Sequence, residues 1–124
     1  MLRVFTDGGS RGNPGPAACA FYSREKRGKY LGIMTNNEAE YEAVILAWEW
    51  LQNQDFDQVE FFSDSSLVVN QLNGKFKIKE ARLREKILKI RSLEKGKFTY
   101  NLVPRSQNLE ADLLVNQTLD SQMR

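Results

Sequence analysis

The order of hydrophobic patterns along the chain is the feature that most restricts its fold. Three strand-like runs, at residues 2–6, 17–23 and 29–35, precede any helical pattern, and a short hinge at Glu25–Gly28 suits a hairpin. Afterwards the patterns alternate in type: helix 36–53, strand 58–63, helices 65–73 and 79–95, strand 97–104 and helix 108–120. This βββαβααβα order predicts an α/β fold with a mixed five-stranded sheet, in which three antiparallel strands are followed by parallel βαβ units, and with helices on both faces.

The helical patterns also predict the start of one helix, and the end and the buried side of another. Asn36 or Asn37 is a candidate cap for helix 36–53, which has acidic residues in its first turn. Helix 79–95 is basic and amphipathic, and Gly96 ends it. Its predicted apolar stripe consists of Leu83, Ile87 and Leu88 with Ile90 or Arg91.

Length and composition exclude several classes of protein. The 124 residues fit a single domain, 1–124, that buries a core without a disulfide or a structural metal. Cys19 is the only cysteine and histidine is absent, which excludes an internal disulfide and a Cys/His zinc site. The chain has neither an apolar run long enough to span a membrane nor a signal-peptide pattern. We therefore expect a cytoplasmic monomer with no obligate protein partner.

Acidic and basic residues occupy different parts of the sequence, although the net charge is only +2. Residues 38–66 hold eight acids and no base, whereas residues 74–97 hold ten bases and three acids. This separation suggests a metal site beside a surface that binds a polyanion. The alternative is a solvated basic helix with no ligand.

Two aspartates follow apolar residues at the ends of predicted strands. Asp7 follows strand 2–6, and Asp64 follows strand 58–63. Ligand sites of open α/β sheets gather at the carboxyl ends of strands, which favours a functional role. Helix capping is the alternative for Asp64, because a helix is predicted to begin at Ser65.

Glu40 is an acid on the apolar side of a helix. At about 100° per residue, Glu42, Glu49 and Asn53 lie within about 60° of Glu38 and define a polar face. Glu40 lies about 200° from Glu38, near Val44, Ala47 and Leu51, and so points at the sheet. A buried carboxylate pairs, protonates or binds metal. The competing interpretation is a buried salt bridge, for example to Arg3 or Arg105.

Asp112 is the fourth candidate acid. Val115 and Leu119 follow it at helical spacing, which places Asp112 on the apolar side of the last helix. The four acids thus come from four separate elements. Oxygen ligands without histidine or cysteine favour Mg²⁺ or Mn²⁺, and two such ions can assist phosphodiester hydrolysis.

Four motifs, in order over nearly the whole chain, resemble those of the ribonuclease H type 1 family. They are Asp7-Gly8-Gly9-Ser10-Arg11-Gly12-Asn13-Pro14-Gly15-Pro16, Thr35-Asn36-Asn37-Glu38-Ala39-Glu40-Tyr41, Ser63-Asp64-Ser65-Ser66-Leu67-Val68-Val69 and Arg105-Ser106-Gln107-Asn108-Leu109-Glu110-Ala111-Asp112. The resemblance implies hydrolysis of RNA paired with DNA, leaving a 5′-phosphate, with two Mg²⁺ ions per site and Mn²⁺ as a possible substitute.

The resemblance also assigns roles to individual residues. It implies that Asp7 bridges both metal ions and that Glu40, Asp64 and Asp112 complete their coordination. It further implies that Asn13, Asn36 and Asn37 contact the strands and the 2′-hydroxyls that distinguish RNA from DNA, and that Thr35 forms part of a phosphate pocket for the DNA strand. From the residues themselves we expect Gly8, Gly12 and Gly15 to allow close approach of the hybrid. Capping is compatible with binding for the two adjacent asparagines.

The chain departs from some family members in three ways. It lacks a histidine before the last aspartate and a separate basic Trp-containing protrusion, and we expect no additional hybrid-binding domain. The stretch of Lys75, Lys77 and Lys79, which leads directly into helix 79–95, is therefore the predicted source of hybrid affinity.

Three other functions remain open from the sequence. The first is a nucleic-acid-binding module of the same fold with weak or no catalysis. The second is a 3′–5′ exonuclease, which would carry Asp-x-Glu on its first strand, where this chain has Asp7-Gly8-Gly9. The third is a structural domain with buried ion pairs.

Overall fold

The computed structural model of the protein describes residues 1–122 and contains the predicted order of elements. The strands are β1 (Leu2–Ser10), β2 (Gly15–Tyr22), β3 (Lys26–Met34), β4 (Gln58–Ser63) and β5 (Lys97–Leu102). The helices are α1 (Asn36–Leu51), α2 (Ser66–Leu72), α3 (Ala81–Leu93) and α4 (Leu109–Gln122), with a short 3₁₀ turn at Arg105–Gln107. Within these residues, no helix is long and apolar enough to cross a membrane.

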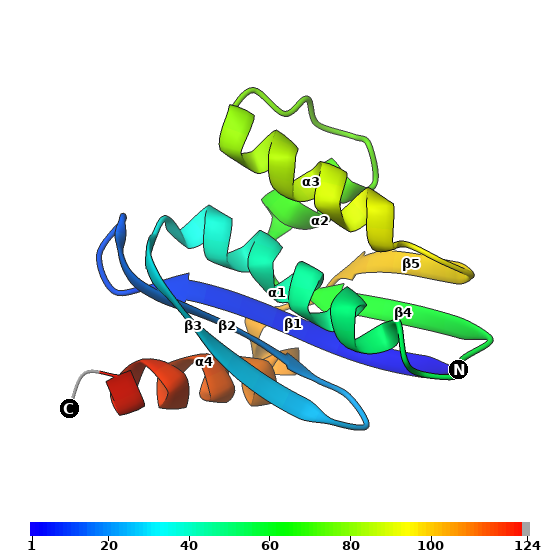
Figure 1. Ribbon diagram of the computed structural model, residues 1–124, viewed down its shortest axis with the longest axis horizontal. Coiled ribbons are helices and arrows are strands. Elements are labelled where there is room, and N and C mark those ends of the chain that lie inside the picture. The colour runs from blue at the N-terminus through cyan, green and yellow to red at the C-terminus, as the bar shows by residue number, and fades with distance from the viewer. Residues whose placement is uncertain (123–124) are drawn as a thin grey trace.

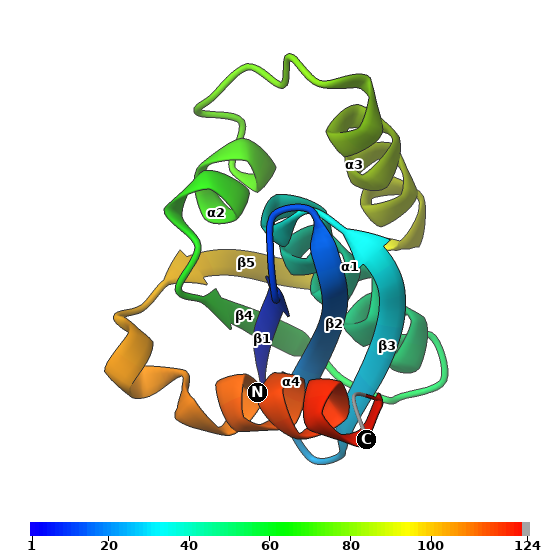
Figure 2. The same ribbon diagram turned by 90° about the vertical axis from the view of Figure 1, so that its left-hand side faces the viewer.

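The sheet confirms the predicted fold class. Its order is β3-β2-β1-β4-β5, with antiparallel pairing of β1, β2 and β3 and parallel pairing of β1 with β4 and of β4 with β5. Helices α1, α2 and α3 lie on one side of the sheet and α4 crosses the other, as Figure 1 and Figure 2 show. The sheet is therefore covered on both faces.

The hairpin between β2 and β3 is tighter than the sequence predicted. Lys26, Arg27 and Gly28 were expected in the hinge, but they pair with Tyr22, Phe21 and Ala20, so that Ser23–Glu25 forms the turn. Charged residues are compatible with β3 because it is an edge strand whose first five residues are exposed. Gly28 has a packing role instead, because a side chain there would collide with Thr118 of α4.

Helix α1 is buried nearly all round, because the sheet covers one side and α3 packs on the other. The polar face predicted around Glu38 is therefore only partly solvated. Arg82 pairs with Glu38 at 3.4 Å, and Lys86 pairs with Glu42 at 3.2 Å. Part of the charge separation in the sequence thus serves the contact between two helices.

Helix α3 buries a narrower stripe than expected. Leu83, Ile87 and Ile90 are buried, but Leu88 is 69% exposed, so its inclusion in the stripe was wrong. The segment before the helix is extended, and α3 begins two residues later than predicted. Further along the chain, β5 stops at Leu102, before Pro104, which has no N–H for a sheet.

The core lies between the sheet and helices α1 to α3. Trp48 packs against Phe61 and Phe98, and its indole Nε1 donates to the Tyr100 hydroxyl at 2.9 Å. Cys19 is also fully buried, opposite Gly8 in the sheet register, and burial raises the pKa of its thiol to about 12. This packing fixes α1 against the sheet.

Strand β1 is longer on one side than on the other. Its parallel pairing with β4 ends at Phe5 and Phe62, whereas its antiparallel pairing with β2 continues to Ser10 and Ala17. Asp7 was predicted to follow the strand but lies inside it. The β1–β4 register, which pairs Phe5 with Phe62, places Asp7 level with Asp64 when it is continued by two residues. One edge of β1 is therefore open at this point, next to the end of β4.

Candidate active site

Three carboxylates from three elements converge at this open edge. One oxygen from each of Asp7, Glu40 and Asp64 lies within 4.8 Å of the others. Asp7 and Glu40 are buried, with 7% exposure each, and Asp64 is half-buried. The hollow beside them has a volume of about 170 Å³ and is also lined by Asp112 and Arg105. The structure thus gathers the four predicted acids around one hollow.

Glu40 reaches the site because α1 packs unusually close to β1. A side chain at Gly8 would collide with the backbone of Ala39 and Glu40. The backbone N–H of Gly8 donates to Glu40 Oε1 at 2.7 Å, which fixes the carboxyl group beside Asp7. The internal contact with α1 accounts for the glycine, whereas close approach of a hybrid at this position stays a prediction.

The salt-bridge interpretation of Glu40 does not hold for the described residues. Arg3 pairs with Glu60 at 3.5 Å, on β4. Arg105 lines the same hollow, but no ion pair joins it to Glu40 in residues 1–122. The charge of Glu40 is therefore not neutralised by either candidate base.

Asp64 does not cap a helix, which was the alternative role suggested by its position. Ser65, and not Asp64, caps α2, with its hydroxyl accepting from the N–H of Val68 at 3.3 Å. The Asp64 carboxylate instead accepts a hydrogen bond of 3.4 Å from Asn108 Nδ2. It therefore faces the hollow and not the helix end.

Asp112 approaches Asp7 from the other face of the sheet. It lies in the first turn of α4. Further along that helix, Val115 and Leu119 pack on the small residues Ala18 and Ala20 of β2. Asp112 is outside the cluster of three but close enough for its charge to act on Asp7. The sequence placed it correctly on the inward side of the helix.

Burial and mutual repulsion weaken the acidity of two of these groups. Burial, followed by the charges of Asp64 and Asp112, raises the pKa of Asp7 to about 7. Burial, followed by the charges of Asp7 and Asp64, raises the pKa of Glu40 well above its usual range. Both shifts oppose full ionisation of the cluster, and a bound cation would reverse them.

The donor set fits a hard divalent cation. All the candidate ligands are carboxylate oxygens, as Mg²⁺ and Mn²⁺ prefer. None of Asp7, Glu40 or Asp64 forms an ion pair with a basic side chain in the part of the chain that the structure describes. The negative charge is therefore available to a metal ion.

The start of α1 organises the loop that follows Asp7. Thr35 is the cap, which corrects the prediction of Asn36 or Asn37: its hydroxyl accepts from the N–H of Glu38, whose side chain accepts from the N–H of Thr35. The spacing Thr-x-x-Glu is the signal that should have identified this capping box. Both asparagines are left free of capping.

Two of the predicted asparagines join this loop to α1. The N–H of Asn36 donates to Asn13 Oδ1 at 3.0 Å, and Asn36 Oδ1 accepts from the N–H of Ser10 at 3.3 Å. Asn36 also lines the carboxylate hollow, whereas Asn37 does not. Asn13 and Asn36 thus lie at the rim of the site.

Asn37 lines a second hollow of about 220 Å³, together with Lys77 and Lys79. Lys75, Lys77 and Lys79 are exposed, and residues 1–122 offer none of them an ion pair. They form the segment between α2 and α3, which we call the lysine segment (residues 75–79). The predicted substrate-binding residues therefore line two different hollows: Gly8 and Asn36 line the carboxylate hollow, and Asn37, Lys77 and Lys79 line the second.

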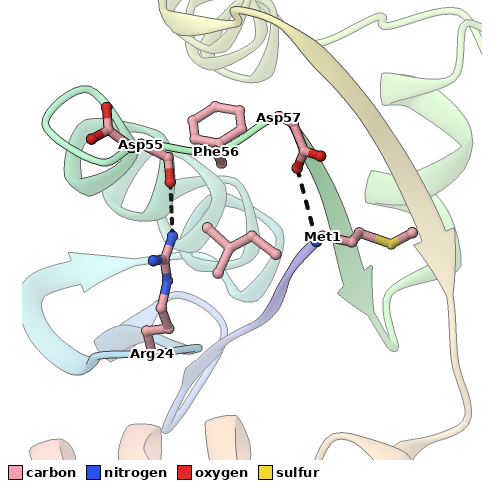
Figure 3. A pocket seen from close by; sticks show the side chains of 6 residues that line it. Met1, Arg24, Asp55, Phe56 and Asp57 are labelled. Atoms are coloured by element: carbon pink, nitrogen blue, oxygen red, sulfur yellow. Dashed lines mark hydrogen bonds and ion pairs between the residues drawn. The ribbon is translucent and has the colours of Figure 1, made fainter.

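The most voluminous of the hollows described here lies at the opposite end of the sheet. It has a volume of about 310 Å³ and contains the chain's amino group, which pairs with Asp57 at 3.8 Å, and Arg24, which donates to the backbone oxygen of Asp55 (Figure 3). It holds no cluster of ligands comparable to that around Asp7.

Comparison with known proteins decides the family. A family model described as "Reverse transcriptase-like" matches residues 5–118. The Ribonuclease HI of Halobacterium salinarum is 38% identical over 96% of this chain and 64% of its own length. The chain belongs to the ribonuclease H type 1 family.

Two further ribonuclease H relatives extend the likeness. The bifunctional protein Rv2228c of Mycobacterium tuberculosis is 34% identical over 95% of this chain and 35% of its own length. The crystal structure of LC11-RNase H1 in complex with an RNA/DNA hybrid has a TM-score of 0.94 and 37% identity, covering 100% of both chains. The chain thus spans about two-thirds and one-third of the two relatives matched by sequence, and the full length of the third.

Proposed function

We propose that this ribonuclease H hydrolyses the RNA strand of RNA–DNA hybrids, as a metal-dependent endonuclease that uses two Mg²⁺ ions. The convergence of Asp7, Glu40 and Asp64 within 4.8 Å, beside Asp112, carries the proposal. The hybrid bound by LC11-RNase H1 supports the substrate class. Metal ions bound to such a cluster would activate water and stabilise the leaving oxygen.

In this proposal Asp7, Glu40, Asp64 and Asp112 would hold the ions and supply their oxygen ligands, and Mn²⁺ could substitute for Mg²⁺. The chain's own contribution is positioning. The N–H of Gly8 donates to Glu40, and the register of β1 with β4 places Asp7 beside Asp64. Because the groups are fixed before the substrate arrives, little reorganisation remains for the reaction step.

Recognition of the hybrid is assigned to the rim. Asn13, Asn36 and Asn37, with Gly8, would contact sugar and backbone groups, and their amides can both donate to and accept from a 2′-hydroxyl. Thr35 would contact a phosphate of the DNA strand, and Lys75, Lys77 and Lys79 would neutralise further phosphates. We take residues 1–124 as one catalytic domain; a cytoplasmic location and a monomeric state stay predictions.

The decisive test is cleavage of a 5′-labelled RNA strand in a hybrid, with Mg²⁺ and with excess chelator. Single-stranded RNA, duplex RNA and duplex DNA serve as parallel substrates. We expect internal cuts in the RNA of the hybrid that depend on metal, with product lengths that exclude removal of one nucleotide at a time from an end.

A binding module of the same fold is the second candidate, supported by the exposed lysine segment. It predicts that the hybrid is retained in a gel-shift assay with chelator and stays intact after Mg²⁺ is added. That result would replace the enzyme proposal.

A further inference from the structure

Asn108 lies fully buried immediately before α4, among the elements that carry the acids. Its side-chain Nδ2 donates to the backbone oxygen of Thr6 at 2.9 Å and to Asp64 Oδ2 at 3.4 Å. Its backbone oxygen accepts from the N–H of Asp112 at 3.1 Å. Asn108 thus contacts the residue before Asp7, one oxygen of Asp64 and the first turn that carries Asp112.

The orientation of the Asn108 amide follows from its contact with Thr6. A backbone oxygen only accepts hydrogen bonds, so the amide must turn its NH₂ group toward it. The same NH₂ group has a second hydrogen, which serves Asp64. An aspartate at this position would place an acceptor against both oxygens, and a leucine would supply no donor.

Packing alone does not account for asparagine here. Asn108 Oδ1 has no hydrogen-bond partner among residues 1–122, and a buried amide oxygen without a donor is costly. An apolar residue of similar shape would avoid that cost. The contact with Asp64 supplies a reason to keep the amide, since partners of metal-binding side chains set the orientation of the ligand.

We propose that Asn108 is a positioning residue that holds one oxygen of Asp64 and leaves the other for the metal ion shared with Asp7 and Glu40. The inference rests on the proposed function, because it assumes that the acids bind metal. Loss of such a partner typically weakens metal affinity by about 10- to 100-fold.

The test measures Mg²⁺ binding by titration calorimetry, with no nucleic acid present, for the wild type, Asn108→Ala and Asn108→Ser. Asn101→Ala is the matched control. Its amide also donates to a strand oxygen, that of Phe61 at 3.1 Å, but to no carboxylate. Unfolding by urea in chelator reports the stability of each variant separately.

We expect the Kd for Mg²⁺ to rise about 10- to 100-fold in Asn108→Ala and to stay within about twofold of wild type in Asn101→Ala. Asn108→Ser should fold even if the alanine variant does not, because serine is favoured before a helix. Its single hydroxyl cannot serve both oxygens, so its Kd should also rise. At saturating hybrid, kcat should fall while KM stays near the wild-type value.

An unchanged Kd in a folded Asn108 variant that has lost stability would reduce Asn108 to a structural residue and overturn the inference. That failure is distinct from failure of the proposed function. In the latter case the wild type itself would bind no Mg²⁺, or Asp7→Asn would bind it as well as the wild type does.

Discussion

Asp7 and Glu40 are buried carboxyl groups whose mutual repulsion destabilises the chain without a cation, and in the proposed function they bind one. Each is desolvated, and each lies beside the negative charge of Asp64. Under the proposed function, the free energy that this arrangement costs the apo fold would be recovered on metal binding, because the cation would offset the repulsion. Substitutions at these positions should therefore change activity and apo stability in opposite directions.

Asp7→Asn should reduce hybrid cleavage by on the order of 10³-fold, since the charge stabilisation at stake is several kcal/mol and each 1.36 kcal/mol is tenfold. In chelator the same change should raise the free energy of unfolding by about 1–3 kcal/mol, because repulsion is relieved. Cleavage kinetics and urea unfolding measure the two effects. Asp55→Asn, at an exposed position away from the acids, is the control and should change neither. Wild-type cleavage by Asp7→Asn would contradict the assigned role.

The apo chain should also lose stability as the pH rises. The pKa of Asp7 is about 7 in the folded chain, against an ordinary value of 3.8. The folded state therefore binds more protons than the unfolded state between these values. Stability from neutral Asp7 is fully present below pH 3.8 and is lost as the pH approaches 7.

The measurement is urea unfolding of the wild type and Asp7→Asn in chelator, from pH of about 4 to about 8. Carboxyl groups far from the site titrate equally in both proteins, so the difference between them reports Asp7 together with Glu40, whose pKa the charge of Asp7 raises. The stability advantage of the variant should grow across this window and level off above pH 7. A difference that does not vary with pH would contradict the raised pKa of Asp7.

At the scale of single residues, sequence reasoning was most successful where one physical rule dominated. Helical periodicity alone placed Glu40 on the buried side of α1, as the structure confirms. It did not find the roles of Gly8 or Asn108. Those depend on hydrogen bonds that span 32 and 44 residues of sequence, for which a single sequence carries no signal.

At the scale of elements, the site depends on how closely α1 approaches β1. Glycine at position 8 lets the backbones of the two elements meet, and the N–H of Gly8 then fixes Glu40. The neighbouring Gly9 is less constrained. A side chain there would lie 3.6 Å from Val115 and 3.7 Å from Asn36, which are ordinary contact distances.

Gly8→Ala should therefore destabilise the chain by about 1–3 kcal/mol or more, because the added methyl group pushes α1 from the sheet. It should also weaken Mg²⁺ binding by moving Glu40. Urea unfolding and calorimetry measure the two effects. Gly9→Ala adds the same methyl group one residue later and should be tolerated. Equal effects of the two substitutions would show that the tight approach of α1 does not matter.

The order, type and sheet directions of the elements were predictable because the hydrophobic periods were regular and short hairpins fix neighbouring strands. The residues at which the elements begin and end were less predictable. Continuation of β1 past Asp7 depends on pairing with β2, and the start of β3 at Lys26 depends on its being an edge strand. These are properties of the assembled sheet, not of the local sequence.

At the scale of the whole molecule, acidic and basic groups have two distinct uses. Arg82 and Lys86 on α3 pair with Glu38 and Glu42 on α1, and this pairing stabilises one helix against the other. The lysine segment projects from the same region without such partners in the described chain. Arg82 and Lys86 are thus engaged between two helices, whereas the lysine segment has no acidic partner in the described residues and is free to meet a polyanion.

Replacing Lys75, Lys77 and Lys79 with glutamine should weaken hybrid binding and flatten its salt dependence. The slope of log K against log[salt] should fall by up to about 0.9 for each phosphate that the protein no longer neutralises. Fluorescence anisotropy in chelator over a salt series measures this. The matched control replaces Lys26, Lys95 and Lys97, which are exposed near the opposite end of the sheet. If the control flattens the slope equally, the lysine segment is not the binding surface.

Burial of Cys19 in β2 bears on how the chain can be labelled. Because the only thiol in the sequence is enclosed and its pKa is about 12, it stays protonated and out of reach of maleimides in the native state. A cysteine introduced at an exposed position would then be the sole point of attachment for a fluorophore. Dyes could be placed at chosen distances from the acids without first removing the native thiol.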